Sequence, residues 1–220
     1  MSDPTWSSVE EYFESLLLPS DPLLEAALEA AIAAGLPQIQ VSASQGKLLH
    51  LLALAHGSRR ILEVGTLGGF STLWLARALP PDGRLVTLEL EPHHAEVARR
   101  NFARAGLAER IDLRVGAAIL SLARLREEQV APFDFVFIDA DKPNNLAYVQ
   151  AALDMSRAGT LIVVDNVVRK GEVVAKHRDA AGEGVRRMAD WIGREPRLSA
   201  TVIQTVGDKG YDGFLLARVQ

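Results

Sequence analysis

The sequence contains no cysteine among its 220 residues, and this absence excludes disulfide bonds and thiolate metal sites. A long hydrophobic run is also absent, because the longest, at 48–55, contains His50 and is far shorter than a membrane-spanning helix. No block of basic residues stands out, and the formal net charge is -4, so we expect neither a nucleic-acid nor a membrane partner. The first four residues lack a basic segment that leads into an apolar run, so we expect no signal peptide and a cytoplasmic location.

What the chain has is the composition of an ordinary globular protein, with 48% hydrophobic and 24% charged residues,. A chain of this length buries roughly 70% of the surface that it exposes when unfolded, which is enough for a full core. We predict a single domain over residues 1–220. Within it, residues 1–57 are expected to form N-terminal helices, and residues 58–220 the core sheet and its helices.

The N-terminal part carries three signals for helix starts. They are a capping box of Ser7 with Glu10, the pair Asp21-Pro22, and Ser42 with Gln45. The second helix is expected to end near Gly35, and the third near residue 56.

Beyond residue 58, short apolar runs alternate with helical patterns. Strands are expected at 60–64, 85–90, 111–115, 133–139 and 161–165, and helices at 71–79, 94–105, 117–128 and 144–157. Such alternation predicts a parallel sheet covered on both faces. A last helix at 184–194 and strands at 199–205 and 213–219 complete the pattern. We therefore predict an α/β, doubly wound, Rossmann-like fold with a seven-stranded, mostly parallel sheet, an antiparallel C-terminal hairpin and an N-terminal helical extension.

The expected strands end on acidic or amide side chains. Ligands of such sheets lie beyond the carboxyl ends of the strands, and these ends carry Glu63, Glu89, Asp139, Asp165 and Asn166. This clustering is the main chemical signal in the sequence.

A glycine-rich loop at 63–71 follows the first expected strand and enters a helix. A dinucleotide loop would read G-x-G-x-x-G, but two residues after Gly65 the chain has Leu67. Glu63 would also repel a phosphate. Both features favour a nucleoside cofactor without phosphate, whose carboxylate the helix N-terminus near Ser71 could hold. The alternative is a purely structural turn.

Glu89 ends the second strand, where an acid can accept hydrogen bonds from both ribose hydroxyls. Glu91 is a competing ribose acceptor, and a solvated strand-end carboxylate is the structural alternative.

Asp139, Asp165 and Asn166 offer three oxygen donors on two strands that we expect to be neighbours. Such a set suits Mg²⁺ or another divalent cation; the alternative is that these side chains cap helices or line the nucleoside pocket. Lys142 follows Asp139 by three residues. A lysine is normally protonated at neutral pH, but a nearby cation and desolvation favour the neutral amine. Lys142 is therefore a candidate base, unless it forms a surface ion pair with Asp141.

The stretch 39–166 resembles the cation-dependent O-methyltransferases of the catechol and caffeoyl-CoA type. The motifs that carry the resemblance are QVS at 40–42 with QG at 45–46, EVGTLGGFS at 63–71, FDFVFIDADK at 133–142 and GTLIVVDN at 159–166.

The resemblance implies transfer of a methyl group from S-adenosylmethionine to a hydroxyl of a small, catechol-like acceptor with neighbouring oxygens. It implies that Asp139, Asp165 and Asn166 bind Mg²⁺, that Lys142 is the base, and that the protein is a homodimer. Asp139 would also face the amino group of the methionine part. The other cofactor contacts that it suggests lie at Val41, Glu63, Gly65, Leu67, Ser71, Glu89 and Ala117, the last beside the adenine.

The chain departs from the family pattern after Asp165-Asn166. Relatives that methylate flat phenols often carry a tryptophan at the position of Arg169, so we expect either a more polar or anionic acceptor than caffeoyl-CoA or a simple catechol, or a reorganised acceptor loop. The alternatives to methyl transfer are an NAD-dependent oxidoreductase on a similar sheet and a non-catalytic nucleoside-binding protein.

Overall fold

The structure is a computed structural model that describes residues 3–130 and 132–220. Its seven strands follow the order β3-β2-β1-β4-β5-β7-β6 through the sheet, and β7 is antiparallel to both of its neighbours, β5 and β6. The predicted α/β fold with a mostly parallel sheet, an antiparallel C-terminal pair and N-terminal helices is confirmed. Contacts divide the chain into two compact units, Phe13–Ser121 and the described part of Met1–Tyr12 with Leu122–Gln220. The single domain over 1–220 stays a prediction.

The unit Phe13–Ser121 contains three parallel strands. They are β1 (Arg60–Val64), β2 (Arg84–Glu89) and β3 (Ile111–Val115), paired β1 with β2 and β2 with β3. Its helices are α2 (Pro22–Ala33), α3 (Ala43–His56), α4 (Phe70–Arg77) and α5 (Pro92–Arg104), and the short η1 (Ala108–Arg110) precedes β3. Helix α2 packs on α5 and α3 on α4. Strands β1 and β2 are buried along almost their whole length, as strands covered by helices are,.

Two of the three predicted helix starts are confirmed. The Asp21 carboxylate accepts hydrogen bonds from the amides of Leu23 and Leu24 at 3.1 and 3.2 Å, and Ser42 Oγ accepts from Gln45 N at 3.2 Å. The capping box at Ser7 is wrong, because α1 (Pro4–Leu17) begins three residues earlier. There a proline takes the first helical position, which costs no hydrogen bond.

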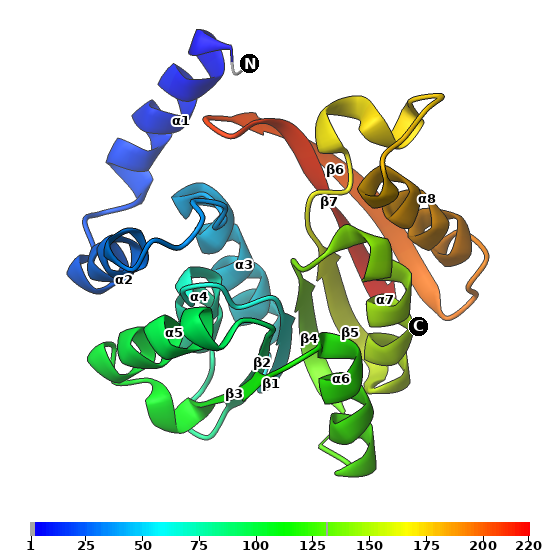
Figure 1. Ribbon diagram of the computed structural model, residues 1–220, viewed down its shortest axis with the longest axis horizontal. Coiled ribbons are helices and arrows are strands. Elements are labelled where there is room, and N and C mark those ends of the chain that lie inside the picture. The colour runs from blue at the N-terminus through cyan, green and yellow to red at the C-terminus, as the bar shows by residue number, and fades with distance from the viewer. Residues whose placement is uncertain (1–2, 131) are drawn as a thin grey trace. The chain divides into compact units, whose positions relative to one another are not determined.

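The other unit contains the remaining strands, β4 (Phe133–Ile138), β5 (Ser156–Val164), β6 (Leu198–Gly207) and β7 (Gly210–Val219). Strands β4 and β5 run parallel, while β7 pairs antiparallel with both β5 and β6. Its helical elements are η2 (Lys142–Asn144), α7 (Asn145–Asp154), η3 (Arg169–Val174) and α8 (Ala180–Ile192). Helices α7 and α8 lie side by side in Figure 1 and are in contact. The helix α6 (Ala118–Glu127) leads from one unit into the other.

Several boundaries differ from the sequence prediction for identifiable reasons. Strand β5 begins at Ser156 rather than 161, because Ser156 pairs with Phe133 across an irregular register and Thr160 Oγ1 donates to Phe133 O at 2.7 Å. Helix α8 begins at residue 180 rather than 184, because the Asp179 carboxylate accepts from Gly182 N at 2.6 Å. Hairpin pairing extends to Gly207 opposite Gly210, beyond the predicted strand ends.

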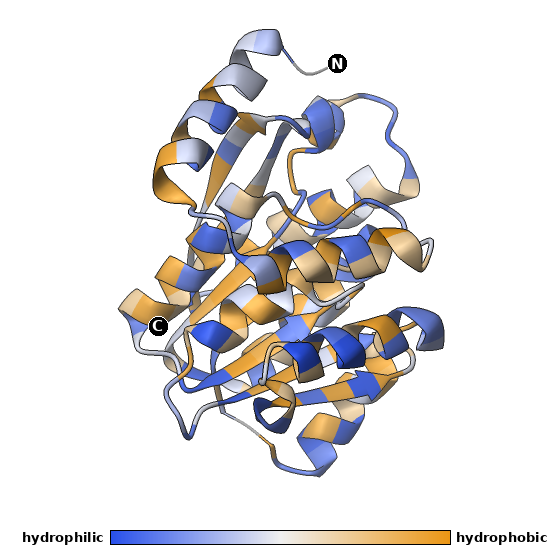
Figure 2. Ribbon diagram, turned by 90° about the vertical axis from the view of Figure 1, so that its left-hand side faces the viewer, coloured by the Kyte–Doolittle hydropathy of each residue, from blue (hydrophilic) through white to orange (hydrophobic). Residues whose placement is uncertain are grey.

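Burial is most complete in β1, β2 and β4, and Figure 2 shows hydrophobic segments alternating with hydrophilic ones along the strands. All six residues of β4 are buried, and Phe133, Phe135 and Phe137 are among the largest fully buried side chains. Among the residues that the structure describes, no helix is both long and apolar enough to cross a membrane.

Candidate active site

The glycine loop between β1 and α4 has the backbone geometry that its sequence requires. Gly65 and Gly69 have φ values of 103° and 86°, which residues with a Cβ rarely adopt. A Cβ on Gly69 would also lie 2.4 Å from the ring of Phe102. Gly69 is the N-cap of α4, so the predicted helix N-terminus is present at the end of this loop. Leu67 (φ 50°) packs against the cluster of Ala31, Leu36 and Val97.

The Glu63 carboxylate lies behind this loop and is fully buried. It accepts hydrogen bonds from the hydroxyls of Ser71 at 2.7 Å and Thr87 at 2.6 Å, and from that of Thr72. A buried carboxylate needs such donors, because desolvation without them is costly. Glu63 and Ser71 therefore join the end of β1 to the first turn of α4. Their predicted contacts with a cofactor stay predictions.

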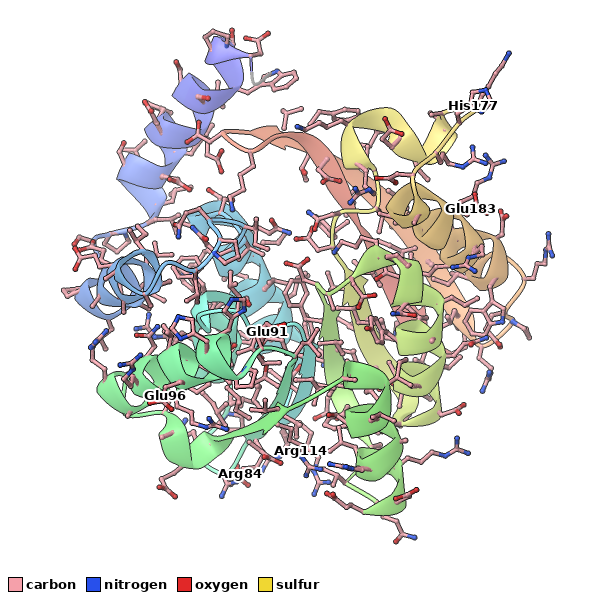
Figure 3. All side chains as sticks on the ribbon, viewed as in Figure 1. Arg84, Glu91, Glu96, Arg114, His177 and Glu183 are labelled. Carbon is pink, nitrogen blue, oxygen red and sulfur yellow. The ribbon has the colours of Figure 1, made fainter. Side chains whose placement is uncertain are left out.

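Glu89 stands at the end of β2 with its side chain turned to the glycine loop. Oε2 accepts from Leu67 N at 2.7 Å and from Thr66 N at 3.2 Å, while Oε1 accepts from Glu91 N at 2.9 Å. His94 Nδ1 lies 3.4 Å from Oε1. The carboxylate thus fixes the loop, and the choice of Glu89 over Glu91 as the ribose acceptor stays a prediction. Glu91 is exposed at the start of α5 (Figure 3).

Val41 and Ala117 are the remaining cofactor candidates in this unit. Val41 is buried directly before α3, whereas Ala117 is exposed between β3 and α6. Gly116, beside it, has φ 135° and donates its amide to Glu89 O at 2.8 Å. Ala117 therefore follows a turn that is tied to the Glu89 backbone.

Asp139, Asp165 and Asn166 follow the neighbouring strands β4 and β5, as predicted. Ile138 pairs with Val164, and Asp165 N donates to Ile138 O at 2.9 Å. Because adjacent strands lie about 4.8 Å apart, the two aspartates are near neighbours. Asp165 is buried and Asn166 partly so. Asn166 has φ 55°, a conformation that asparagine tolerates better than most residues.

Lys142 is buried, at 8% exposure, and its Nζ donates to Asp139 Oδ1 at 2.8 Å. The alternative pairing with Asp141 is wrong. Asp141 instead accepts hydrogen bonds from Asn144 Nδ2 at 2.6 Å and from the hydroxyl of Tyr148. Burial, and then this hydrogen bond, raise the pKa of Tyr148. The base candidate and a metal-ligand candidate are therefore in direct contact.

Lys209, at the turn between β6 and β7, was missed from the sequence. Desolvation lowers the pKa of Lys209, although part of the residue is exposed, and the carboxylates of Asp139, Asp165 and Glu10 act in the opposite direction. Those electrostatic interactions place a second ammonium group near the acidic pair. The hairpin turn is also held to α1, because Asp208 N donates to Glu10 Oε2 at 2.7 Å.

The donor set fits a hard cation. Asp139, Asp165 and Asn166 provide only oxygen ligands, which Mg²⁺ prefers, and within the described residues Asp139 Oδ2 accepts no hydrogen bond. The set contains two carboxylates and an amide. Because one of the three donors is an asparagine, the set does not form a group of three or more His, Cys, Asp or Glu, and residues 3–130 and 132–220 contain no such group that could hold a metal ion.

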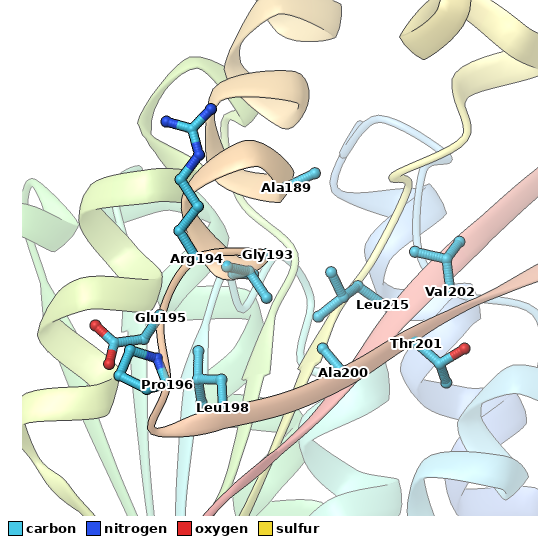
Figure 4. A pocket seen from close by; sticks show the side chains of 11 residues that line it. Ala189, Gly193, Arg194, Glu195, Pro196, Leu198, Ala200, Thr201, Val202 and Leu215 are labelled. Atoms are coloured by element: carbon cyan, nitrogen blue, oxygen red, sulfur yellow. The ribbon is translucent and has the colours of Figure 1, made fainter.

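A cavity of about 500 Å³ lies elsewhere, between the end of α8 and β6 (Figure 4). Its lining includes Ile192, Arg194, Pro196, Ala200 and Leu215. None of the predicted site residues lines it, so we do not assign it to the chemistry.

The strand order, the glycine loop that enters α4 and the acidic strand ends define an α/β protein of the Rossmann-like methyltransferase class. The chain belongs to the O-methyltransferase family, whose sequence profile matches residues 15–219.

Individual relatives match almost the whole chain. A catechol O-methyltransferase of Mycobacterium tuberculosis is 54% identical over 217 residues, covering 99% of this chain and 97% of that protein. The solved structure of an O-methyltransferase from Bacillus cereus in complex with SAH has a TM-score of 0.97 at 52% identity, covering 98% and 99% of the two chains. TomG from Streptomyces achromogenes in complex with SAM has a TM-score of 0.96 at 51% identity, covering 100% and 99%. The predicted family and enzyme class are confirmed, and neither the oxidoreductase nor the non-catalytic alternative is retained.

Proposed function

We propose that this enzyme transfers the methyl group of S-adenosylmethionine to one of two neighbouring hydroxyls on a small acceptor of the catechol class. Relatives with about half of their residues identical are named catechol O-methyltransferases or carry SAH or SAM in their structures. The observation that carries the proposal is the contact of Lys142 with Asp139, one strand away from Asp165 and Asn166. This arrangement offers a base and oxygen ligands within one small region.

The methyl donor would occupy the glycine loop at the end of β1. Glu89 supplies a carboxylate oxygen for a ribose hydroxyl, while the first turn of α4 offers amides to the methionine carboxylate. Glu63 keeps this turn in place through Ser71, Thr72 and Thr87. We assign Val41, Gly65, Leu67 and Ala117 to the same site, with Ala117 beside the adenine.

Asp139, Asp165 and Asn166 would hold a divalent cation, for which their oxygen donors are suited. Such a cation supplies Lewis acidity that favours the ionised form of an acceptor hydroxyl. The two aspartates also form a negative environment, and the amines of Lys142 and Lys209 lie beside it.

Methyl transfer needs alignment more than covalent help from the protein. The acceptor oxygen bonds to the methyl carbon as the carbon–sulfur bond breaks, and the hydroxyl proton passes to Lys142 as the base and from there to solvent. Positioning of the two reactants supplies about 7–11 kcal/mol of the barrier reduction. The burial of Lys142 in η2 holds its amine in one place for this transfer.

Arg169 supports a polar or anionic acceptor. Its guanidinium lies 3.5 Å from Asp179, a distance too long for a strong ion pair, and its buried Nε has no hydrogen-bond partner in the described chain. An acceptor carboxylate would satisfy this donor. We expect Arg169→Ala to raise the KM of a carboxylated catechol and to leave that of an uncharged catechol unchanged. Equal effects on both acceptors would contradict this assignment.

The test of the function is transfer of a labelled methyl group to a panel of catechols. We expect activity with added Mg²⁺, its loss with a chelator, and its loss in Asp165→Ala with SAH binding retained. Full activity in chelator would contradict the role of the cation, and binding of NAD without binding of SAH would contradict methyl transfer.

We also propose a cytoplasmic homodimer. The absence of cysteine is compatible with a reducing compartment,, and the apolar side chains Tyr12, Phe13, Leu16 and Leu17 are exposed on α1. Sedimentation at micromolar concentration should give twice the chain mass of 23.9 kDa, and a monomer would contradict the dimer.

A further inference from the structure

The loop that follows β5 has an unusual backbone. Asn166, Arg169 and Lys170 have φ values of 55°, 52° and 54°, and Gly171 has 90°. Side chains with a Cβ disfavour this left-handed region. Three non-glycine residues in this region within five positions, directly after Asp165, require an external constraint,.

The Asp212 carboxylate on β7 supplies that constraint. Its Oδ1 accepts hydrogen bonds from Arg169 N at 2.8 Å and Val168 N at 3.2 Å, and from Gly213 N at 2.9 Å. One carboxylate oxygen therefore joins two successive amides of the loop to the strand. Hydrogen bonds to a charged acceptor are roughly twice as strong as neutral ones.

Backbone and packing contacts reinforce this connection. Val167 N donates to Gly213 O at 2.9 Å, and Val167 and Val168 are buried. A Cβ on Gly213 would lie 2.4 Å from Ile203 O and 2.7 Å from Val168 Cγ2. The loop and the start of β7 thus approach so closely that only glycine fits at position 213.

We propose that Asp212 is the positioning residue for the metal ligands Asp165 and Asn166. The Asp212 carboxylate binds the backbone amides of Val168 and Arg169 and so fixes the loop that contains Asn166. Asn166 is thereby held in the left-handed conformation that places its side-chain oxygen beside the Asp165 carboxylate. This inference rests on the proposed cation site. Asp212 needs no contact with the cation or with substrate, and its effect passes through the backbone of Val168 and Arg169.

Asp212→Ala removes the acceptor, Asp212→Asn keeps an amide oxygen that can accept the same bonds, and Asp208→Ala is the matched control. Asp208 is an exposed aspartate on the same hairpin, and the hydrogen bond to Glu10 uses its backbone amide. The readouts are amide hydrogen exchange of Val168 and Arg169 without metal, the Kd of Mn²⁺, and the Kd of SAH.

In Asp212→Ala we expect faster exchange at Val168 and Arg169, and Mn²⁺ affinity about 10–100-fold weaker, as for other residues that orient metal ligands. SAH affinity should not change. Asp212→Asn should recover most of the Mn²⁺ affinity, and Asp208→Ala should match the wild type.

Unchanged Mn²⁺ affinity in Asp212→Ala would overturn the inference while leaving the cation site intact. Weaker Mn²⁺ binding by Asp212→Ala with unchanged amide exchange would also overturn the inference. An equal loss of Mn²⁺ affinity in Asp212→Asn would do the same. A wild type that binds no Mn²⁺ would refute the proposed cation site and this inference with it. If Asp212→Ala does not fold, Asp212→Asn is compared with Asp208→Ala: the neutral acceptor weakens the hydrogen bonds to the loop, so amide exchange at Val168 and Arg169 should be faster than in Asp208→Ala and Mn²⁺ binding slightly weaker. Exchange and Mn²⁺ affinity equal to those of Asp208→Ala would overturn the inference.

Discussion

Replacement of Glu89 tests how the nucleoside is held. A carboxylate has about four lone-pair sites. Three of those of Glu89 already accept hydrogen bonds, from the backbone amides of Thr66, Leu67 and Glu91. About one site is therefore left for a ribose hydroxyl. A hydrogen bond to a charged acceptor contributes about 1.5–3 kcal/mol, which corresponds to roughly 10–150-fold in affinity.

We therefore expect Glu89→Ala to weaken SAH binding by at least this factor, with an added loss because the loop amides lose their acceptor. Glu89→Gln keeps one oxygen for Thr66 and Leu67 but turns an NH₂ group toward Glu91 N, so its affinity should be intermediate. Glu91→Ala is the control and should bind SAH as the wild type does. Calorimetric titration measures all three, and SAH binding by Glu89→Ala within about twofold of the wild type would refute the reasoning.

Three further outcomes are expected. Lys142→Met should lower kcat by about 10²–10⁴-fold with SAH affinity retained; a normal kcat in rapid-quench assays would exclude Lys142 as the base. Asp21→Ala should destabilise the protein by about 1 kcal/mol in urea unfolding. Arg77 lowers the Asp21 pKa from 3.8, so this difference should be present above about pH 4 and shrink as pH falls through the lowered pKa; a pH-independent difference would contradict the pairing. Gly184→Ala should reduce kcat, because a Cβ would lie 2.2 Å from Lys142 O, whereas Gly182→Ala should not, and equal activities would contradict that close packing.

The sheet was predictable because its strands are local apolar runs. The ranges 60–64 and 111–115 agree with β1 and β3 residue for residue. The start of β5 could not be predicted, because Ser156 joins the sheet through its pairing with Phe133 and not through its own hydrophobicity. The glycines at 207 and 210 indicate the hairpin turn, and the turn lies there, at Asp208 and Lys209.

The candidate site was predictable in its residue types and their strand-end positions. The direction of each side chain was not, because it depends on partners distant in sequence. The Glu63 carboxylate, for example, accepts hydrogen bonds from hydroxyls of α4 and β2. The parts played by Lys209 and Asp212 arise only when β7 pairs with β5, and no local pattern encodes that pairing.

The cation site is the central claim, and anomalous diffraction from crystals soaked with Mn²⁺ and SAH tests it most directly. We predict one strong peak bound by oxygens of Asp139, Asp165 and Asn166 at about 2.0–2.3 Å, distances typical of small oxygen-ligated divalent ions. A peak bound by other residues, or none beside these three side chains at saturating Mn²⁺, would contradict the account.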